Sequence, residues 1–229
     1  MNPNAQKKVP AAYGIIGMPL GHSKSPLLHN WGLRECGMPG RYEAWPTEPG
    51  NKLKAFLAEV RVRRIKGVSV TIPHKQAVMP FLDELTERAK AVGAVNTLFW
   101  QNGKLTGDNT DVAGISAALA EWTTTNSNNA VFSSAVVLGA GGAARAACLA
   151  LKEFGVADIA VANRTPGKAK CVARELSVRA IPWEERASNA EQGGAPWELI
   201  VNSTPLGMQG ANETLSPMPA EALTGVRLV

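Results

Sequence analysis

The sequence predicts an α/β protein with two domains, and three observations support this prediction. Short apolar runs rich in β-branched residues alternate with amphipathic helical patterns through the first half of the chain. From residue 135 onward the pattern becomes a regular repeat of strand, helix and strand, which is typical of a parallel sheet. The first strand of that repeat runs straight into the glycine cluster 139–142. We therefore expect an N-terminal α/β domain over residues 1–111 and a Rossmann-like domain over residues 112–229, with a cleft between them.

The elements of the first domain follow from hydrophobic periodicity and from turn residues. Strands are expected over 12–17, 41–45, 67–72, 95–100 and 104–108, and helices over 26–36, 51–60 and 82–92. Pro26 suits the first turn of a helix, with Ser25 as its N-cap. Leu27, Leu28 and Trp31 are expected to form part of the apolar face of that helix.

The later elements alternate regularly. The pair Asn102-Gly103 predicts a tight hairpin turn between the last two strands of the first domain. Further strands are expected over 135–138, 158–162 and 198–202, and helices over 112–122, 142–154 and 167–176. Parallel strands joined by helices predict a doubly wound sheet with right-handed crossovers.

Composition argues against several classes of protein. Apolar residues make up 45% and charged residues 19% of the 229 residues, which is ordinary for a soluble globular protein. No apolar run is long enough to cross a bilayer and the polar start lacks a signal-peptide core, so we expect no membrane association and a cytoplasmic location. The net charge of +5 is dispersed along the chain, which argues against a nucleic-acid partner.

The cysteines do not predict a disulfide framework. Cys36, Cys148 and Cys171 are odd in number and widely spaced, so we expect buried, reduced thiols. They show no zinc-like spacing with the three histidines, and we expect no metal site.

The glycine cluster has the spacing of a dinucleotide-binding turn. Gly139 and Gly141 permit unusual backbone angles and leave room for a pyrophosphate, while the helix that begins near Gly142 offers free N–H groups. Ala144 completes the G-x-G-x-x-A pattern, and Ala140 and Ala143 are small residues at its variable positions. The alternative is a tight strand-to-helix turn that binds no ligand.

The end of the next strand favours NADP over NAD. An NAD-binding fold usually places an acid there, whereas this chain has Asn163, Arg164 and Thr165, about 20 residues after the glycines. A guanidinium with a neighbouring hydroxyl suits a 2′-phosphate. The alternative is a solvated arginine at the end of a strand.

Two polar groups in the first domain could act on a small acid. The strand over 67–72 ends at a proline and delivers Lys75 to its tip, where open α/β sheets bind ligands. A lysine steered by an aspartate such as Asp111 can exchange a proton with an alcohol, although Lys75 could be a surface charge and Asp111 a helix N-cap. Ser23 and Ser25 could hold a carboxylate at a helix N-terminus, although capping alone would explain Ser25.

The order and spacing of several segments resemble the shikimate dehydrogenase family. These segments are GMPLGHSKSP, GVSVTIPHK, GAVNTL, GDNTD, LGAGGAAR, ANRTPGK and VNSTPLGM. The resemblance covers nearly the whole chain. It implies reversible reduction of 3-dehydroshikimate to shikimate by NADPH, a step in the biosynthesis of aromatic amino acids, by a monomer or homodimer.

The resemblance also implies roles for particular residues. Lys75 and Asp111 would be the catalytic pair, and Ser23 and Ser25 would hold the substrate carboxylate. Thr71, Asn96 and Asp111 would bind the ring hydroxyls. The cofactor residues would be Gly139, Ala140, Gly141, Gly142, Ala143, Asn163, Arg164, Thr165, Thr204 and Met208. At position 69 this chain has serine where the family more often has asparagine.

The resemblance leaves three matters open. The family continues beyond Val229 into a segment that returns to the substrate domain, so we expect the 229-residue chain to show weakened catalysis. A quinate or quinate/shikimate dehydrogenase using NAD(P) is a close alternative. A relative that senses the same acid without catalysis is a second alternative, which the pairing of Lys75 with Asp111 disfavours.

Overall fold

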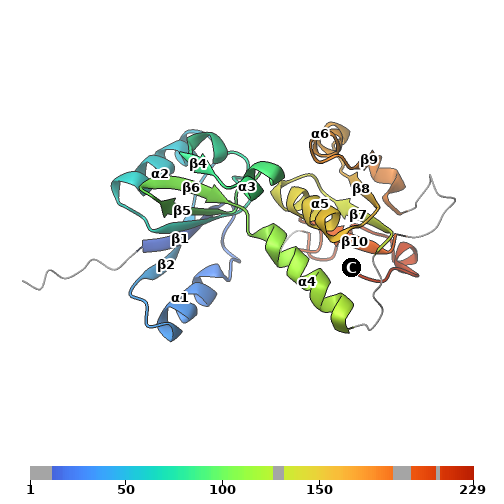
Figure 1. Ribbon diagram of the computed structural model, residues 1–229, viewed down its shortest axis with the longest axis horizontal. Helices are drawn as coiled ribbons and strands as arrows, with labels where there is room; N and C mark the ends of the chain where they lie inside the picture. Colours follow the sequence, from blue (N-terminus) through green and yellow to red (C-terminus); the bar gives the residue numbers. More distant parts are fainter. Residues whose placement is uncertain (1–11, 126–131, 188–196, 210–211) are drawn as a thin grey trace, which may run out of the picture. The chain divides into compact units, whose positions relative to one another are not determined.

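The computed structural model describes residues 12–125, 132–187, 197–209 and 212–229, and it divides the chain into two compact units (Figure 1). One unit runs up to Thr86 and also contains Val95–Asp108, while the other contains Glu87–Ala94 and the chain from Asn109 onward. The two-domain α/β class expected from the sequence is confirmed. The second unit also takes in a short helix, α3 (Glu87–Val92), from the middle of the first.

The first unit is built on a mixed six-stranded sheet of order β2-β1-β3-β5-β6-β4. The strands are β1 (Ala12–Gly17), β2 (Arg41–Pro46), β3 (Gly67–Val70), β4 (Glu84–Leu85), β5 (Thr97–Gln101) and β6 (Lys104–Asp108). Strand β1 lies parallel to β2 and β3, whereas β5 is antiparallel to both β3 and β6. Asn102 and Gly103 both have positive φ, so the predicted hairpin between β5 and β6 is confirmed. Helices α1 (Ser25–Glu35) and α2 (Asn51–Val62) lie on opposite faces of the sheet (Figure 1).

Helix α1 corrects two predictions about its start and its orientation. Ser25 is the first residue of the helix, so it is not the N-cap; Lys24 takes that position, and no side chain caps the helix within the described residues. Leu27 and Leu28 are 71% and 61% exposed, so the predicted apolar face is wrong. The cause is Asn30, whose side-chain amide donates to the Tyr42 carbonyl at 2.8 Å and accepts from the Tyr42 N–H at 2.9 Å. These bonds turn the Asn30 side of the helix toward β2.

The predicted helix over residues 82–92 is also wrong in its first half. That stretch forms the short strand β4, which pairs in parallel with β6, and only α3 is helical. The Asp83 carboxylate accepts two hydrogen bonds from the Arg61 guanidinium and one from the Leu105 N–H, at 2.7–2.9 Å. This pairing at the sheet edge overrides the local helical pattern, and it holds the pKa of Asp83 below its usual value.

The second unit contains a four-stranded, fully parallel sheet of order β10-β7-β8-β9. Its strands are β7 (Ser134–Leu138), β8 (Asp158–Ala162), β9 (Arg179–Ile181) and β10 (Leu199–Asn202). Its longer helices are α4 (Asp111–Thr125), α5 (Gly142–Phe154) and α6 (Pro166–Leu176). The parallel strand and helix repeat is confirmed, although β9 was not predicted because it is only three residues long.

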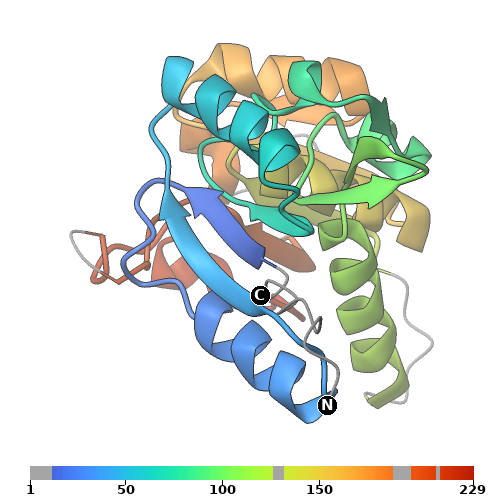
Figure 2. The same ribbon diagram turned by 90° about the vertical axis from the view of Figure 1, so that its left-hand side faces the viewer.

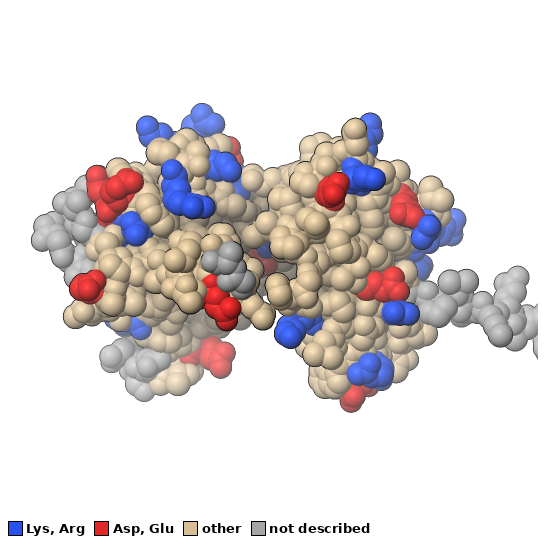
Figure 3. Space-filling model, turned by 180° about the vertical axis from the view of Figure 1, so that it is seen from behind, with Lys and Arg blue, Asp and Glu red and all other residues tan. Residues whose placement is uncertain are grey.

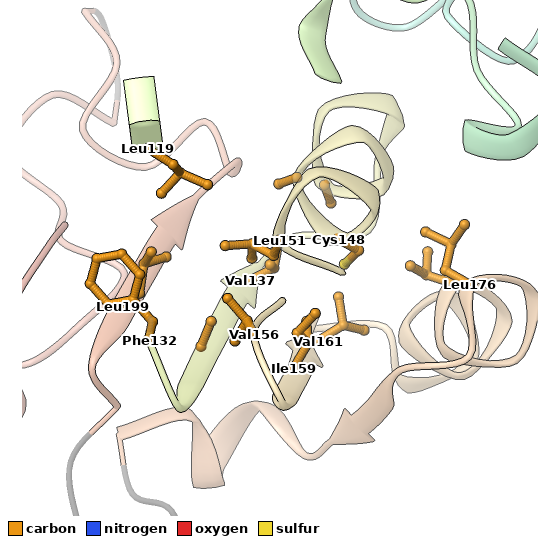
Figure 4. Close-up of a cluster of buried hydrophobic side chains, with 14 of the residues drawn as sticks. Leu119, Phe132, Val137, Cys148, Leu151, Val156, Ile159, Val161, Leu176 and Leu199 are labelled. Carbon is orange, nitrogen blue, oxygen red and sulfur yellow. The ribbon is translucent and has the colours of Figure 1, made fainter. Parts of the chain in front are cut away.

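An apolar core lies between this sheet and its helices (Figure 4). Val137 and Val161 point from the strands toward Leu151 and Cys148 on α5, and all four are fully buried or nearly so. Burial raises the pKa of the Cys148 thiol to about 12, so this thiol stays protonated. All three cysteines are free, but only Cys148 is buried as expected; Cys36 is exposed and Cys171 is partly exposed.

A buried arginine fixes α3 to the second unit. Arg145 on α5 is 4% exposed, its Nε donates to the Val92 carbonyl at 2.7 Å, and its guanidinium is bonded to Glu175. A Cβ at Gly93 would lie 2.6 Å from the same guanidinium. Arg145 therefore holds the end of α3, from which the chain returns to the first unit.

We expect Arg145→Met to lower the free energy of unfolding by about 2 to 4 kcal/mol, because it leaves the buried Val92 carbonyl without its donor. Chemical denaturation measures this loss. Arg63→Met is the matched control, since the Arg63–Glu59 ion pair is exposed and its loss is expected to cost less than about 0.5 kcal/mol. Equal effects of the two substitutions would contradict the role given to Arg145.

The described surface shows neither a membrane-crossing helix nor a metal cluster. No helix within the described ranges has the length and apolarity needed to cross a membrane. No group of three or more His, Cys, Asp or Glu residues among those described is arranged to hold a metal ion. On the face shown in Figure 3, lysine and arginine are interspersed with acidic residues.

Candidate active site

The first group of predicted residues lies where α1 begins. The loop between β1 and α1 is held by the Met18 N–H, which donates to the Ile72 carbonyl at 2.9 Å. Ser23 and Ser25 are both partly buried, and the Ser25 N–H donates to Ser23 Oγ at 3.3 Å. No side chain caps α1 among the described residues, and its second residue, Pro26, has no N–H, so the two serine hydroxyls are the principal donors that this helix start offers to an anion.

Lys75 is carried on a turn that is fixed at three points. The Thr71 N–H donates to the Ile16 carbonyl at 2.9 Å, and the Lys75 carbonyl accepts from the Val95 N–H at 2.7 Å. Between them, His74 is fully buried and its Nε2 lies 2.7 Å from the Thr47 carbonyl, so Nε2 carries the proton. The backbone that presents Lys75 is therefore held rigidly against the ends of β1 and β2.

Asn96 lies beside this turn, just before β5. Its carbonyl accepts from the Val70 N–H at 2.7 Å, and its side-chain oxygen accepts from the Thr97 hydroxyl at 2.8 Å. The pairing of Ser69 with Thr97 places Thr71 and Asn96 at one edge of the sheet. The structure thus brings Ser23, Ser25, Thr71, Lys75 and Asn96 to the same edge of the first unit.

Asp111 belongs to the second unit and begins α4. Its N–H donates to Asn109 Oδ1 at 3.1 Å, while Asn109 Nδ2 donates to the Ala94 carbonyl at 3.0 Å. Asn109 is fully buried, so it fixes both the start of α4 and the chain after α3. We did not predict this role for Asn109, and the motif GDNTD was the only signal that could have suggested it.

The glycine cluster lies at the C-terminal end of β7. Gly139 has φ of +113°, and a Cβ there would lie 2.4 Å from Ser203 Oγ. A Cβ on Gly141 would meet no atom within 4 Å, and α5, which begins at Gly142, has no side-chain cap in the described part of the chain. Open space in front of free N–H groups fits a dinucleotide pyrophosphate, with Ala140 and Ala143 as the small residues flanking it.

The predicted phosphate contact lies beside this turn, at the end of β8. The Gly139 N–H donates to the Ala162 carbonyl at 2.8 Å, which places Asn163 next to the glycines. Arg164 is exposed and makes no ion pair among the described residues, while Thr165 precedes α6 without capping it. An unpaired guanidinium at this point is chemically suited to a 2′-phosphate.

The third loop of this edge follows β10 and contains Thr204 and Met208. The Thr204 hydroxyl donates to Asn202 Oδ1 at 2.7 Å, and Met208 is 57% exposed. Between Asn202 and Thr204, Ser203 donates to the Leu138 carbonyl at 2.7 Å and supports the glycine turn. Ser203 was missed because its role depends on β10 lying beside β7.

Comparison with known sequence families gives two matches to this chain. The profile described as the shikimate dehydrogenase substrate binding domain matches residues 15–98. The profile described as shikimate / quinate 5-dehydrogenase matches residues 121–195. The first match contains the serine loop and Lys75, and the second contains the glycine turn and Arg164.

Individual relatives are similar over most of the chain. A shikimate dehydrogenase (NADP(+)) of Maridesulfovibrio salexigens is 48% identical over 209 residues, which cover 91% of this chain and 72% of that relative. A solved shikimate 5-dehydrogenase of Thermus thermophilus, in complex with NADP(H) and shikimate, is 38% identical with a TM-score of 0.75, covering 93% of this chain and 74% of that one. A quinate dehydrogenase of Corynebacterium glutamicum, in complex with NAD, is 30% identical with a TM-score of 0.78, covering 93% and 77%.

Proposed function

This chain belongs to the shikimate dehydrogenase family, and we propose that it catalyses the reversible reduction of 3-dehydroshikimate to shikimate with NADPH. The observation that carries the proposal is the 48% identity to an NADP-dependent relative over 91% of the chain. A match over 91% of the chain extends into both units.

The residues on the substrate side bind different groups of a small hydroxylated acid. Ser23 and Ser25 hold the carboxylate, because both hydroxyls can donate to it at the start of α1. Thr71, Asn96 and Asp111 bind the ring hydroxyls. Four of these residues lie at one edge of the first unit, which supports the assignment: Ser23, Ser25, Thr71 and Asn96.

Lys75 is the acid and base of the reaction. NADPH, when bound, supplies the hydride to the carbonyl carbon. The Lys75 ammonium donates a proton to the carbonyl oxygen as that oxygen becomes negative, and in the reverse direction the neutral amine accepts the hydroxyl proton. Asp111 acts with Lys75 as the second member of the catalytic pair. The turn held by Thr71, His74 and Val95 supports the role of Lys75, since catalysis needs a fixed proton donor.

The cofactor-side residues follow the strand ends of the second unit. Gly139, Ala140, Gly141, Gly142 and Ala143 accommodate the pyrophosphate. Asn163, Arg164 and Thr165 bind the adenosine end with its 2′-phosphate, and Thr204 and Met208 lie at the nicotinamide end. The open space at Gly141 and the unpaired guanidinium of Arg164 support this assignment.

The test is to follow the absorbance of reduced nicotinamide with shikimate or quinate, each combined with NADP or NAD. The proposal expects the shikimate and NADP pair to give the highest kcat/KM. The similarity to an NAD-bound quinate dehydrogenase makes the quinate and NAD pair the informative competitor. A higher value for that pair would overturn the assignment, and four absent rates would favour a sensor without catalysis.

Arg164→Gln is expected to reduce the preference for NADP over NAD by about tenfold to a hundredfold, because it removes a charge-assisted bond to the 2′-phosphate. The ratio of kcat/KM for the two cofactors measures the preference. Arg34→Gln, an exposed position on α1 of the other unit, is the matched control and should leave the ratio unchanged. An unchanged ratio in Arg164→Gln would mean that the guanidinium is merely solvated.

A further inference from the structure

Tyr42 is held between the sheet of the first unit and α1. It lies on β2, is 6% exposed, and both its backbone N–H and its carbonyl are bonded to Asn30. Its ring stacks on the His29 ring, with centroids 4.3 Å apart and an interplanar angle of 16°. Figure 2 shows β2 running beside α1. The ring therefore has a fixed position, and so does the direction of its hydroxyl.

The Tyr42 hydroxyl is buried and has no hydrogen-bond partner in the described part of the chain. Burial raises the pKa of Tyr42, and the hydroxyls of Ser69 and Ser25, which lie close to the phenol without reaching hydrogen-bond geometry, act in the opposite direction. The phenol is consequently protonated at neutral pH and remains a donor. Buried donors are seldom left unpaired, so an unpaired one directed at two serines calls for a ligand-dependent explanation.

Strand register explains why these hydroxyls converge. Tyr42 pairs with Tyr13, and Ser69 pairs with Ile15, two residues farther along β1. Residues two apart on a strand share a face, so Tyr42 and Ser69 both lie on the face covered by α1. Ser25 reaches the same place from the first turn of α1. The Ser25 and Ser69 hydroxyls thus both lie near that of Tyr42, at the uncapped start of an eleven-residue helix.

We propose that Tyr42 is a positioning residue for the substrate carboxylate, acting through Ser25. When the carboxylate binds, the Ser25 hydroxyl donates to it and accepts from the Tyr42 hydroxyl, beside which Ser69 lies. A serine hydroxyl donates once and accepts twice, so a donor behind it fixes its proton on the substrate side. Consecutive hydrogen bonds of this kind strengthen one another, particularly when the last acceptor is charged. This inference rests on the proposed function, because it concerns the same acid.

Tyr42→Phe tests the inference through binding and kinetics together. We expect the Kd and KM for shikimate to rise about threefold to tenfold, with kcat and the KM for NADP unchanged within about twofold. The thermal midpoint of the free protein should not fall, because the lost hydroxyl has no partner there. Tyr13→Phe makes the same change on the neighbouring strand and should leave the Kd for shikimate unchanged.

A double-mutant cycle identifies the route. If Tyr42 acts through Ser25, Tyr42→Phe should have no further effect on the Kd for shikimate in a Ser25→Ala background. An unchanged Kd in Tyr42→Phe, or the same loss in both backgrounds, would overturn the inference while the proposed function stands. Shikimate binding without turnover by the wild-type protein would refute the proposed function and leave this comparison intact. Absence of shikimate binding by the wild-type protein would overturn both.

Discussion

Lys75→Ala is expected to lower kcat for shikimate oxidation by about a hundredfold to ten-thousandfold while shikimate still binds. Alanine cannot accept the hydroxyl proton of shikimate, so water has to accept it instead. The rest of the site should survive, because the turn is held by backbone hydrogen bonds and by the buried His74 side chain. In this variant kcat should therefore fall while shikimate binding is retained.

The measurement is steady-state kinetics combined with the Kd for shikimate. Lys66→Ala is the matched control, because Lys66 is an exposed lysine immediately before β3, whereas Lys75 follows its other end. Turnover by Lys66→Ala should stay within about twofold of wild type. A kcat for Lys75→Ala equal to that of Lys66→Ala would remove Lys75 from the mechanism.

Much of the fold was predictable because the local signals agreed with the global structure. The alternation ending at Pro73, the Asn102-Gly103 turn and the glycines after β7 each have one dominant conformational solution. These features also fix the sheet edges at which the candidate residues lie. The residues with roles in the proposed site were consequently found before the structure, although their roles stay predictions.

The errors share a physical cause, which is that a contact distant in sequence overrode a local pattern. The amide of Asn30 turned α1 so that Leu27 faces solvent, and the Asp83 carboxylate drew its segment into the sheet instead of a helix. Asn109 and Ser203 were missed for a related reason, since each acts by bonding to the carbonyl of another segment. Such partners are set by tertiary structure and leave no periodic signal.

The two glycines of the cofactor turn are expected to respond differently to the same substitution. Gly139→Ala should lower the free energy of unfolding by about 3 kcal/mol, because alanine at a φ of +113° is strained and its Cβ would collide with Ser203. Gly141→Ala should leave stability unchanged within about 0.5 kcal/mol, since φ there is −88° and the space around a Cβ is open.

The affinity for NADP should distinguish the two variants in the opposite way, because Gly141→Ala keeps its stability but should bind NADP more weakly. A methyl group on Gly141 occupies the space assigned to the pyrophosphate, so we expect the Kd for NADP to rise about a hundredfold, with the Kd for shikimate unchanged. Denaturation curves measure the free energy of unfolding of each variant, and cofactor titrations measure its Kd for NADP. If Gly141→Ala binds NADP as wild type does, the open space is not where the cofactor lies, and the turn serves folding alone. If Gly141→Ala instead unfolds as readily as Gly139→Ala, the glycine is structural, and the space around it cannot be attributed to a ligand.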